Sequence, residues 1–299
     1  ESHSEKRGES YGVLHLQIAK SRPVTELLSE DLGLSAERLN ELIALGAVYV
    51  EGERQRDLES FTAVARVGSY VRIHTNPRRY YVPSAAELKN AVVADHPDFL
   101  IVNKPAGIPV HALVDNAVEN LKYALSRSLG VELFTTSRLD IPTCGLMVYA
   151  KNKGFLEAYN RSVRERTTSK RYRALVRGST PDRLPPLGLW THFMDPSIQA
   201  PKIISHEKKD RSRICELKVL RTQIFSKEVA EVEIDLITGR THQIRAQLAY
   251  ESFPILGDRL YGSRALVFVG EEIALQCFYL KTPFFEQVIE RPRAWGALC

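Results

Sequence analysis

The sequence predicts an α+β fold, in which helices surround a mixed, mainly antiparallel sheet. From about residue 92 onward, strand-like apolar segments outnumber helical ones, and most of them follow one another through short connections. The chain has 299 residues, of which 44% are apolar and 26% charged, so it can bury a large core. This length favours one large domain together with a small one.

Residues 1–80 are expected to form a small α/β module with a flexible N-terminus. Two helical stretches are predicted, over 25–33 and after Ser35, which is a good N-cap. Alternating apolar residues then predict two strands, over 47–53 and 69–75.

Residues 81–91 are expected to be a linker with a short helix-like segment, and residues 92–299 to form the main domain. Gly130 is a typical residue just beyond the end of a helix. Strands are predicted over 99–104, 146–151, 169–178, 215–223, 228–239 and 277–285, and helices over 114–130, 154–166 and 240–252.

Composition narrows the class of protein. The formal charge of +5 and the pI near 9.0 suit a polyanionic partner. No run approaches the roughly 20 apolar residues of a membrane span, so no membrane partner is expected. The four cysteines lie far apart without a CxxC pair. Neither a disulfide framework nor a metal site is therefore expected, and a reducing compartment is favoured.

The segment "SRLDIPTCGL" places Asp140 on a turn rich in proline and glycine, directly before a strand-like run. Reactive groups are often carried by loops on rigid sheets. From the residues alone, Asp140 is a candidate nucleophile, general base or metal ligand, or a side chain that merely caps the turn.

Four segments in chain order resemble the motifs of the RluA-type family of RNA pseudouridine synthases. They are "HPDFLIVNKPAGIPVH", "SRLDIPTCGLMVYAK", "SKRYRALVRG" and "LITGRTHQIRAQLAYESFPILGDRLYG". Two positions depart from the family pattern, since Ser137 and Cys144 replace its usual His and Ser. No His adjoins Cys144 in the sequence, so we expect a small packing residue there and not a catalytic thiol. The resemblance implies that 92–299 is a catalytic domain.

The resemblance also implies the reaction, which is isomerisation of RNA uridines to pseudouridine without a cofactor. Asp140 would attack C1′ of the sugar or C6 of the base, or remove the 2′ proton. Tyr172 would stack on the uracil and assist proton transfer. Arg245 would pair with Asp140 and keep its carboxylate charged, with Arg240 as the alternative partner.

Residues in both the main domain and the small module are expected to contact RNA. By resemblance, Arg138 takes the place of the flipped uridine, and Arg240 and His242 contact RNA or arrange their loop. The segment "LGAVYVEG" resembles the RNA-binding module of many bacterial pseudouridine synthases, with Glu51 in place of the usual Asn. In that module Arg38, and with it Arg54 and Arg56, would contact phosphates; the alternative is a generic helix-strand cap.

Two other functions stay open at this point. One is an RNA-binding protein of the same fold that has lost its activity. The other is a glycoside hydrolase, which needs two carboxylates flanking a bond, whereas Asp258 looks structural. The sequence does not identify the RNA. A monomer is expected, inside the cell, either in the cytoplasm or in an organelle (chloroplast or mitochondrion).

Overall fold

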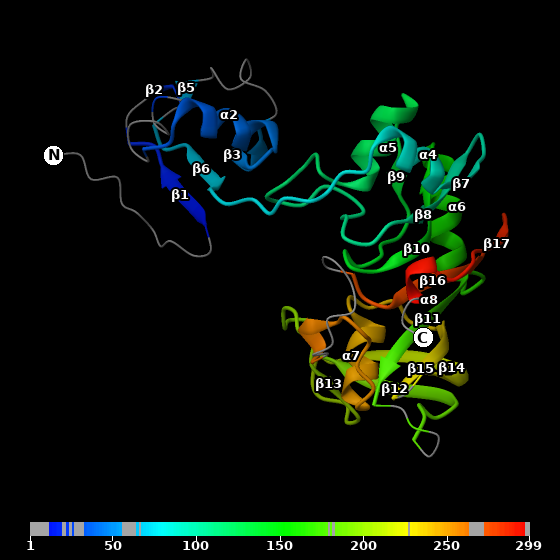
Figure 1. The fold of residues 1–299 in the computed structure, drawn as a ribbon. Helices are drawn as coiled ribbons and strands as arrows, with labels where there is room; N and C mark the ends of the chain where they lie inside the picture. Colours follow the sequence, from blue (N-terminus) through cyan, green and yellow to red (C-terminus); the bar gives the residue numbers. More distant parts are fainter. Residues whose placement is uncertain are drawn as a thin grey trace. The chain divides into compact units, whose positions relative to one another are not determined.

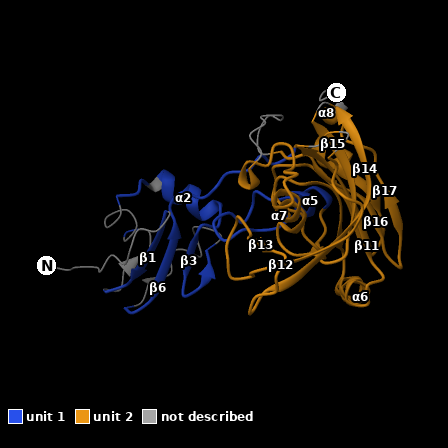
Figure 2. Ribbon diagram, turned by 90° about the horizontal axis from the view of Figure 1, so that it is seen from below, with its two compact units in different colours: residues 1–83, 111–129 blue, residues 84–110, 130–299 orange. Residues whose placement is uncertain are grey.

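The computed structural model describes residues 12–19, 22–23, 26, 33–55, 64–65, 67–178, 180, 183–226, 228–262 and 272–296. The described chain divides into two compact units, coloured separately in Figure 2. Unit 1 comprises residues Glu1–Pro83 and His111–Leu129, and unit 2 comprises Ser84–Val110 and Gly130–Cys299. Residues 111–129, which we expected in the main domain, thus cluster with the N-terminal residues. The functional division at 80 and 92 stays a prediction.

Unit 2 is built on one large sheet, as the α+β prediction requires (Figure 1). Its main path runs β13-β12-β14-β15-β11-β16-β10-β8-β7, while β17 pairs with β16 and β9 with β10. All these pairs are antiparallel except β10 with β16. The strands are β7 (Val92–Asp95), β8 (Phe99–Lys104), β9 (Phe134–Thr135), β10 (Cys144–Ala150), β11 (Ser169–Arg177), β12 (Gly188–Met194), β13 (Ile204–Ser205), β14 (Arg213–Ser226), β15 (Val229–Leu236), β16 (Leu275–Lys281) and β17 (Glu286–Val288).

Helices lie against this sheet and close its core. Helix α6 contacts β9 and β10, α4 contacts β7 and β8, and α7 contacts β13. One large apolar cluster joins residues of β8, β10, β11, β14, β15 and β16 to α6 and α7. The helices of unit 2 are α4 (Ala85–Ala91), α6 (Lys153–Arg164), α7 (Gln243–Tyr250), the 3-10 turn η1 (Arg259–Tyr261) and α8 (Arg293–Gly296).

The parallel contact of β10 with β16 depends on Gly145. Its φ is +114°, and a Cβ there would lie 2.3 Å from the backbone oxygen of Cys277. Any larger residue would push the two strands apart. Gly145 therefore lets β10 follow closely on the loop that carries Asp140.

Unit 1 packs helix α2 on a small antiparallel sheet. Ser35 caps α2 as predicted, since its hydroxyl accepts from the backbone N–H of Arg38 at 3.1 Å. The apolar face of α2 meets the sheet in a core that includes Leu42 and Ile73. The first predicted helix, over 25–33, lies outside the described residues apart from its residues 26 and 33. The elements are β1 (Val13–Gln17), β2 (Arg22–Pro23), α2 (Ala36–Ala44), β3 (Val48–Val50), β4 (Glu53–Arg54), β5 (Val64–Ala65), β6 (Tyr70–His74) and α5 (Leu121–Leu129).

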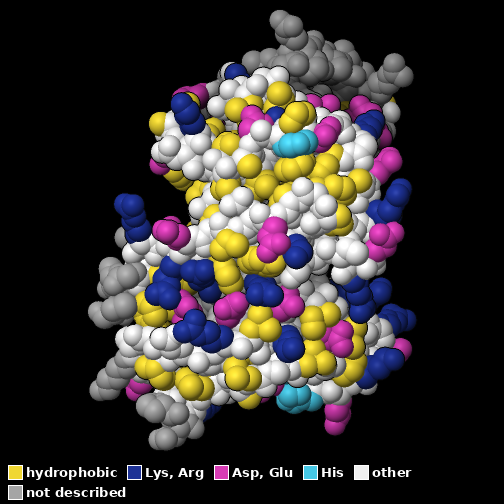
Figure 3. Space-filling view, turned by 90° about the vertical axis from the view of Figure 1, so that its right-hand side faces the viewer, with side chains coloured by type: hydrophobic (Ala, Val, Ile, Leu, Met, Phe, Trp, Pro, Cys, Tyr) yellow, Lys and Arg dark blue, Asp and Glu magenta, His cyan; other side chains and the backbone are white. Residues whose placement is uncertain are grey.

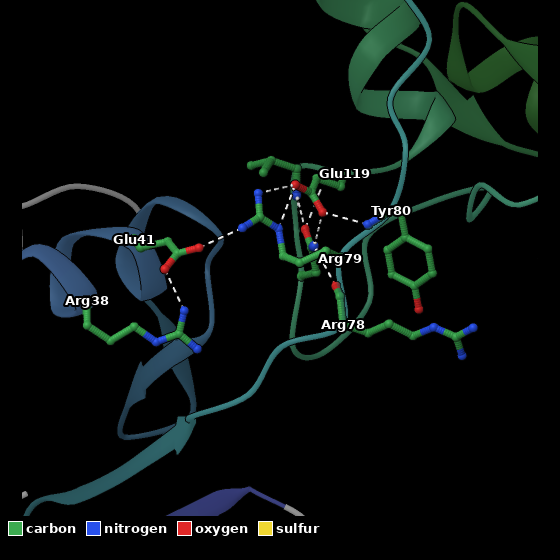
Figure 4. Close-up of polar contacts among 8 residues, drawn as sticks. Arg38, Glu41, Arg78, Arg79, Tyr80 and Glu119 are labelled. Carbon is green, nitrogen blue, oxygen red and sulfur yellow. Dashed lines mark hydrogen bonds and ion pairs between the residues drawn. The ribbon is translucent and has the colours of Figure 1, made fainter. Parts of the chain in front are cut away.

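Ion pairs join the two chain segments of unit 1 (Figure 4). The guanidinium of Arg79 contacts Glu41 of α2 at 2.6 Å and Glu119 at 2.7 Å. Glu119 also accepts from the backbone N–H of Tyr80 at 2.8 Å. The segment 111–129 is thereby fastened to the residues that follow β6, and through Arg79 to α2.

Helix α5 is shorter than predicted. The expected helix over 114–130 begins only at Leu121. The Asn116 side chain accepts from the backbone N–H groups of Val118 and Glu119, and such local bonds compete with the helix.

Candidate active site

Asp140 lies on the loop between β9 and β10, and the loop is fixed from several sides. Leu139 packs against the large core, while the Asp140 carbonyl accepts from the Thr143 N–H at 3.1 Å. The backbone N–H of Gly107, on another loop, donates to the carbonyl of Ile141 at 2.8 Å. The Asp140 side chain is 22% exposed, so it can reach a ligand. The turn therefore presents a carboxylate on a rigid support.

Lys104 holds the same loop from beneath. Its side chain is fully buried, and its Nζ donates to the carbonyl oxygens of Pro105, Ile141 and Thr143 at 2.9–3.0 Å. An ammonium group has three N–H donors, one for each of these acceptors. Burial lowers the pKa of Lys104 to about 7, while the neighbouring Cys144 and Asp140 oppose this shift. No role of Lys104 was predicted from the sequence.

The lowered pKa of Lys104 implies that the free energy of unfolding depends on pH. The pKa of this lysine is about 7 in the folded chain and near 10.5 in the unfolded chain. Between these two pH values the unfolded chain binds more protons at Lys104 than the folded chain does. The free energy of unfolding should therefore rise with pH, by about 1–2 kcal/mol between about pH 7 and 8.5. In Lys104→Met, which also leaves three carbonyls without a donor, this rise should disappear. Urea unfolding at several pH values measures both effects; the same rise in the variant would contradict the assignment.

Helix α7 supplies the partner of Asp140. Its residues Gln243 to Leu248 are all buried, so its polar side chains need internal partners. Gln243 accepts from the Thr238 hydroxyl and from the Arg240 backbone N–H, and donates to the Glu216 carbonyl. These bonds fix the helix start to β14 and to the segment that follows β15. Ile244 and Leu248 belong to the large core.

Arg245 bridges two carboxylates. Its Nε and Nη2 donate to the two oxygens of Asp258 at 2.7 and 2.9 Å, and Nη1 donates to Asp140 Oδ2 at 3.3 Å. Burial lowers the pKa of Arg245, but the hydrogen bond and charge of Asp258, and then Asp140, raise it overall. Of the two arginines considered from the sequence, Arg245 is the one in contact with Asp140. Asp258, only 1% exposed, is the ion-pair partner that sequence reasoning missed.

His242 and Tyr261 complete the polar surroundings of Asp140. His242 Nε2 lies 4.0 Å from Asp140 Oδ2, and its Nδ1 lies 3.1 Å from the Tyr261 hydroxyl. Burial lowers the pKa of His242, against the nearby charge of Asp140. His242 has a φ of +59°, which is uncommon for a residue with a side chain and is often found at functional sites. This conformation delays the helix start from the predicted residue 240 to Gln243.

Tyr172 lies on β11, and its side chain is 5% exposed. Burial, the charge of Cys277, a hydrogen bond with Cys277 and the charge of Asp140 all raise the pKa of its hydroxyl. The hydroxyl therefore stays protonated at neutral pH. Burial raises the pKa of Cys144 to about 12, which agrees with a packing residue and not a reactive thiol.

Several of the residues predicted to contact RNA are more exposed than Arg245 and Tyr172. Arg138 and Arg240 are exposed, and they lie on the loops that carry Asp140 and His242. In unit 1, Arg38 already contacts Glu41 at 2.5 Å and the Thr75 carbonyl at 2.7 Å.

Of the two other arginines predicted to contact phosphates, the structure describes only Arg54. Arg54 donates to the Tyr49 hydroxyl and the Leu113 carbonyl, while Arg56 lies outside the described residues. Among the described helices, none is both long and apolar enough to cross a membrane.

Comparisons with known proteins identify the family to which the chain belongs. The model of the family described as RNA pseudouridylate synthase matches residues 98–250, about half of the chain. "RNA pseudouridine synthase 6, chloroplastic" of Arabidopsis thaliana is 28% identical over 87% of this chain and 60% of that protein. "Ribosomal large subunit pseudouridine synthase C" of Buchnera aphidicola is 31% identical over 59% of this chain and 55% of that protein. The chain thus spans about three fifths of the length of these curated relatives.

A solved structure supports the fold. That of human RNA pseudouridylate synthase domain containing 4 superposes with a TM-score of 0.54, at 22% identity, over 70% of this chain and 91% of that one. The predicted α+β fold with a mainly antiparallel sheet is therefore confirmed. Because the family model covers half of the chain, the resemblance found in the motifs is confirmed as well. The chain belongs to the RNA pseudouridylate synthase family.

Proposed function

We propose that this chain isomerises uridines in RNA to pseudouridine, with Asp140 as the group that starts the reaction. The observation that carries the proposal is the buried Arg245, held by Asp258 on one side and aimed at the partly exposed carboxylate of Asp140 on the other. A fixed cation keeps a carboxylate ionised where a stacked base excludes water. An ionised carboxylate is what each route of this reaction requires.

The reaction breaks the N1–C1′ bond of the uridine and forms a C5–C1′ bond. The proton leaves C5 and N1 gains one, so the product is an isomer and no cofactor is needed. Asp140 either adds to C1′ or C6, or removes the 2′ proton to give a glycal; we favour the glycal route. In each route Arg245 positions the carboxylate without itself touching the uracil.

Tyr172 is proposed to stack on the uracil and to move a proton through its hydroxyl. Tyr172→Phe keeps the ring, so RNA affinity should persist while turnover falls by about 10²-fold. Tyr149→Phe is the matched control, because that buried hydroxyl donates to the Val110 carbonyl on the other side of β10. Single-turnover rates and RNA binding measure the two effects. Equal rates for Tyr172→Phe and the wild type would leave Tyr172 a packing residue.

A uridine inside a structured RNA has to leave its stack to reach Asp140, at a cost of a few kcal/mol. The exposed Arg138 is proposed to fill the vacated space, because a guanidinium is planar and can stack while still contacting phosphate. Arg240 and His242 are proposed to contact the RNA beside the flipped nucleotide. For Arg38 we expect only a small contribution, because Glu41 and Thr75 already occupy its guanidinium.

RNA affinity should fall as salt rises, because Lys and Arg side chains displace cations condensed on the phosphates. On the face drawn in Figure 3, Lys and Arg side chains lie among Asp and Glu, and no uniformly basic surface is seen there. We expect a moderate slope of log affinity against log salt, from a few phosphate contacts. Filter binding across a salt series measures it. An affinity independent of salt would contradict an extended RNA surface.

The direct test is pseudouridine formation by the purified chain. Total RNA from cells that lack the protein should gain pseudouridine when the wild type is added. Ribosomal RNA is the first substrate to test, because relatives carry ribosomal large subunit in their names. RNA binding without any pseudouridine would favour the alternative, an RNA-binding protein that has lost its activity.

Location and assembly are part of the proposal. We propose an organelle, and the chloroplast first, because two similar plant proteins are named chloroplastic. We propose a monomer, which size-exclusion chromatography with light scattering tests directly. Imaging of a fluorescent fusion of the full-length protein tests the location.

A further inference from the structure

Three side chains that the proposed reaction does not use converge in unit 2. His192 comes from β12, His206 follows β13, and Glu251 directly follows α7. Figure 1 shows α7, β12 and β13 side by side. One donor atom from each of the three lies within 4.8 Å of the other two. The fold thus gathers two imidazoles and a carboxylate from distant parts of the sequence.

The spacing of the donor atoms suits a transition-metal ion. Glu251 Oε1 lies 2.7 Å from His192 Nε2 and 3.4 Å from His206 Nε2. Two donors bound tetrahedrally at about 2.1 Å from a zinc ion lie about 3.4 Å apart. Small side-chain rotations would therefore bring all three to the ion. Two His and one Glu form a known zinc ligand set that leaves a fourth position for water.

The surroundings orient the two imidazole rings. The His192 and His206 ring centroids lie 4.8 Å apart, and the Tyr250 ring meets both rings edge-on at 5.4 and 5.0 Å. His192 is 2% exposed, whereas the His206 side chain is 63% exposed. The cluster therefore has one fixed ligand inside and an open side through which an ion can enter.

Gln247 supplies a second observation. Its side chain is fully buried; its Nε2 lies 2.8 Å from His192 Nδ1, and its Oε1 has no hydrogen-bond partner among the described residues. With a metal on Nε2, the His192 proton would lie on Nδ1. Rotation of the Gln247 amide by 180° would then give Oε1 a donor, in exchange for the 3.3 Å bond that Nε2 donates to the Cys215 carbonyl. Metal-bound histidines usually donate their second N–H to such an oxygen.

The position of the Glu251 carboxylate also favours a bound cation. A carboxylate at the C-terminal end of a helix faces the negative end of the helix dipole, which is unfavourable. A divalent cation at Glu251 would offset this repulsion. It would also tie the end of α7 to β12 and to the segment after β13, six residues along the helix from Arg245.

We propose that His192, His206 and Glu251 form a binding site for one divalent transition-metal ion of the zinc class, which clips the end of α7 to the sheet. The expectation of no metal site rested on cysteine spacing, and it did not consider these residues. Their positions, 192, 206 and 251, form no motif, so only the fold brings them together.

The test uses the full chain without a histidine tag, stripped of metal with a chelator. Equilibrium dialysis against micromolar Zn²⁺ should give saturable binding of one ion per chain. With Zn²⁺ at about 100 times its Kd, the Tm should rise by about 5 °C or more. Co²⁺, which takes similar ligands, should give the visible absorption of a protein-bound ion as an independent readout.

Variants locate the site. His206→Ala and Glu251→Gln should each weaken Zn²⁺ binding by about tenfold or more and remove the rise in Tm. Both side chains are partly exposed, so these variants should fold, whereas the buried His192 is left intact. His96→Ala is the matched control, since His96 is an exposed histidine 3.7 Å from Asp98 and belongs to no cluster of three possible ligands among the described residues.

Three results would overturn the proposal. The first is the absence of saturable binding by the wild type. The second is binding that His206→Ala and Glu251→Gln leave unchanged, which would place the ion elsewhere. The third is an equal loss in His96→Ala, which would indicate unspecific capture by surface histidines.

Discussion

Replacing Asp140 by asparagine should abolish pseudouridine formation while the chain still folds and binds RNA. Asparagine keeps the size of the side chain and much of its hydrogen bonding, but it removes the charge and with it the nucleophile or base. RNA affinity should stay near that of the wild type or rise, because repulsion between the carboxylate and the phosphates is gone. Arg245 keeps its two bonds to Asp258, so only a modest loss of stability is expected.

The measurements for Asp140→Asn are pseudouridine yield, RNA binding and thermal melting on the same preparation. Asp210→Asn is the matched control, because it makes the same chemical change at a side chain that is 99% exposed. A folded Asp140→Asn variant that binds RNA and isomerises uridine at the wild-type rate would contradict the proposed role of Asp140. Loss of activity in Asp210→Asn as well would point to damage unrelated to the site.

Replacing Arg245 by methionine should have the largest effect on stability. Asp258 would then lie buried without its cation, and removal of one partner of a buried ion pair typically costs about 3–5 kcal/mol. For a unit of this size the Tm should fall by about 6 °C or more. Turnover should be lost too, because Asp140 loses the charge that favours its ionised form.

Arg240→Met provides the comparison for Arg245→Met. Arg240 lies five residues earlier, but its side chain is exposed. Its loss should weaken RNA binding and leave the Tm within about 1 °C of the wild type, as for most surface substitutions. Differential scanning calorimetry of both variants tests this. A Tm for Arg245→Met as high as that of Arg240→Met would show that the Arg245–Asp258 pair contributes nothing to stability.

Strands with regular apolar patterns were predictable from the sequence. The predicted strand 99–104 coincides with β8. No strand was predicted over 188–194, where β12 lies, because His192 occupies an inward position that an apolar residue normally fills. Its buried partner Gln247, distant in the sequence, makes that position acceptable. Local patterns do not contain such compensation.

Site residues could be predicted from the sequence only where they lie in a motif of the family. Asp140, Tyr172 and Arg245 were named from segments that resemble a family. The roles of Lys104 and Asp258 were not predicted, because each depends on contacts with residues distant in the chain. One example is the bond from Lys104 to the carbonyl of Thr143. A lysine at the end of an apolar strand-like run is the local signal that could have drawn attention to Lys104.

Because unit 1 is made of two chain segments, its contacts form at different times during synthesis of the chain on the ribosome. Arg79 emerges 40 residues before its partner Glu119, which at typical rates of synthesis is a delay of about 2–8 s. The strand β8 is made during that delay, although its neighbour β10 has yet to appear. The contacts of Arg79 with Glu119 can therefore form only after β8 of the other unit has been synthesised. The core between α2 and the small sheet uses only residues that precede Arg79, so it can form before these contacts do.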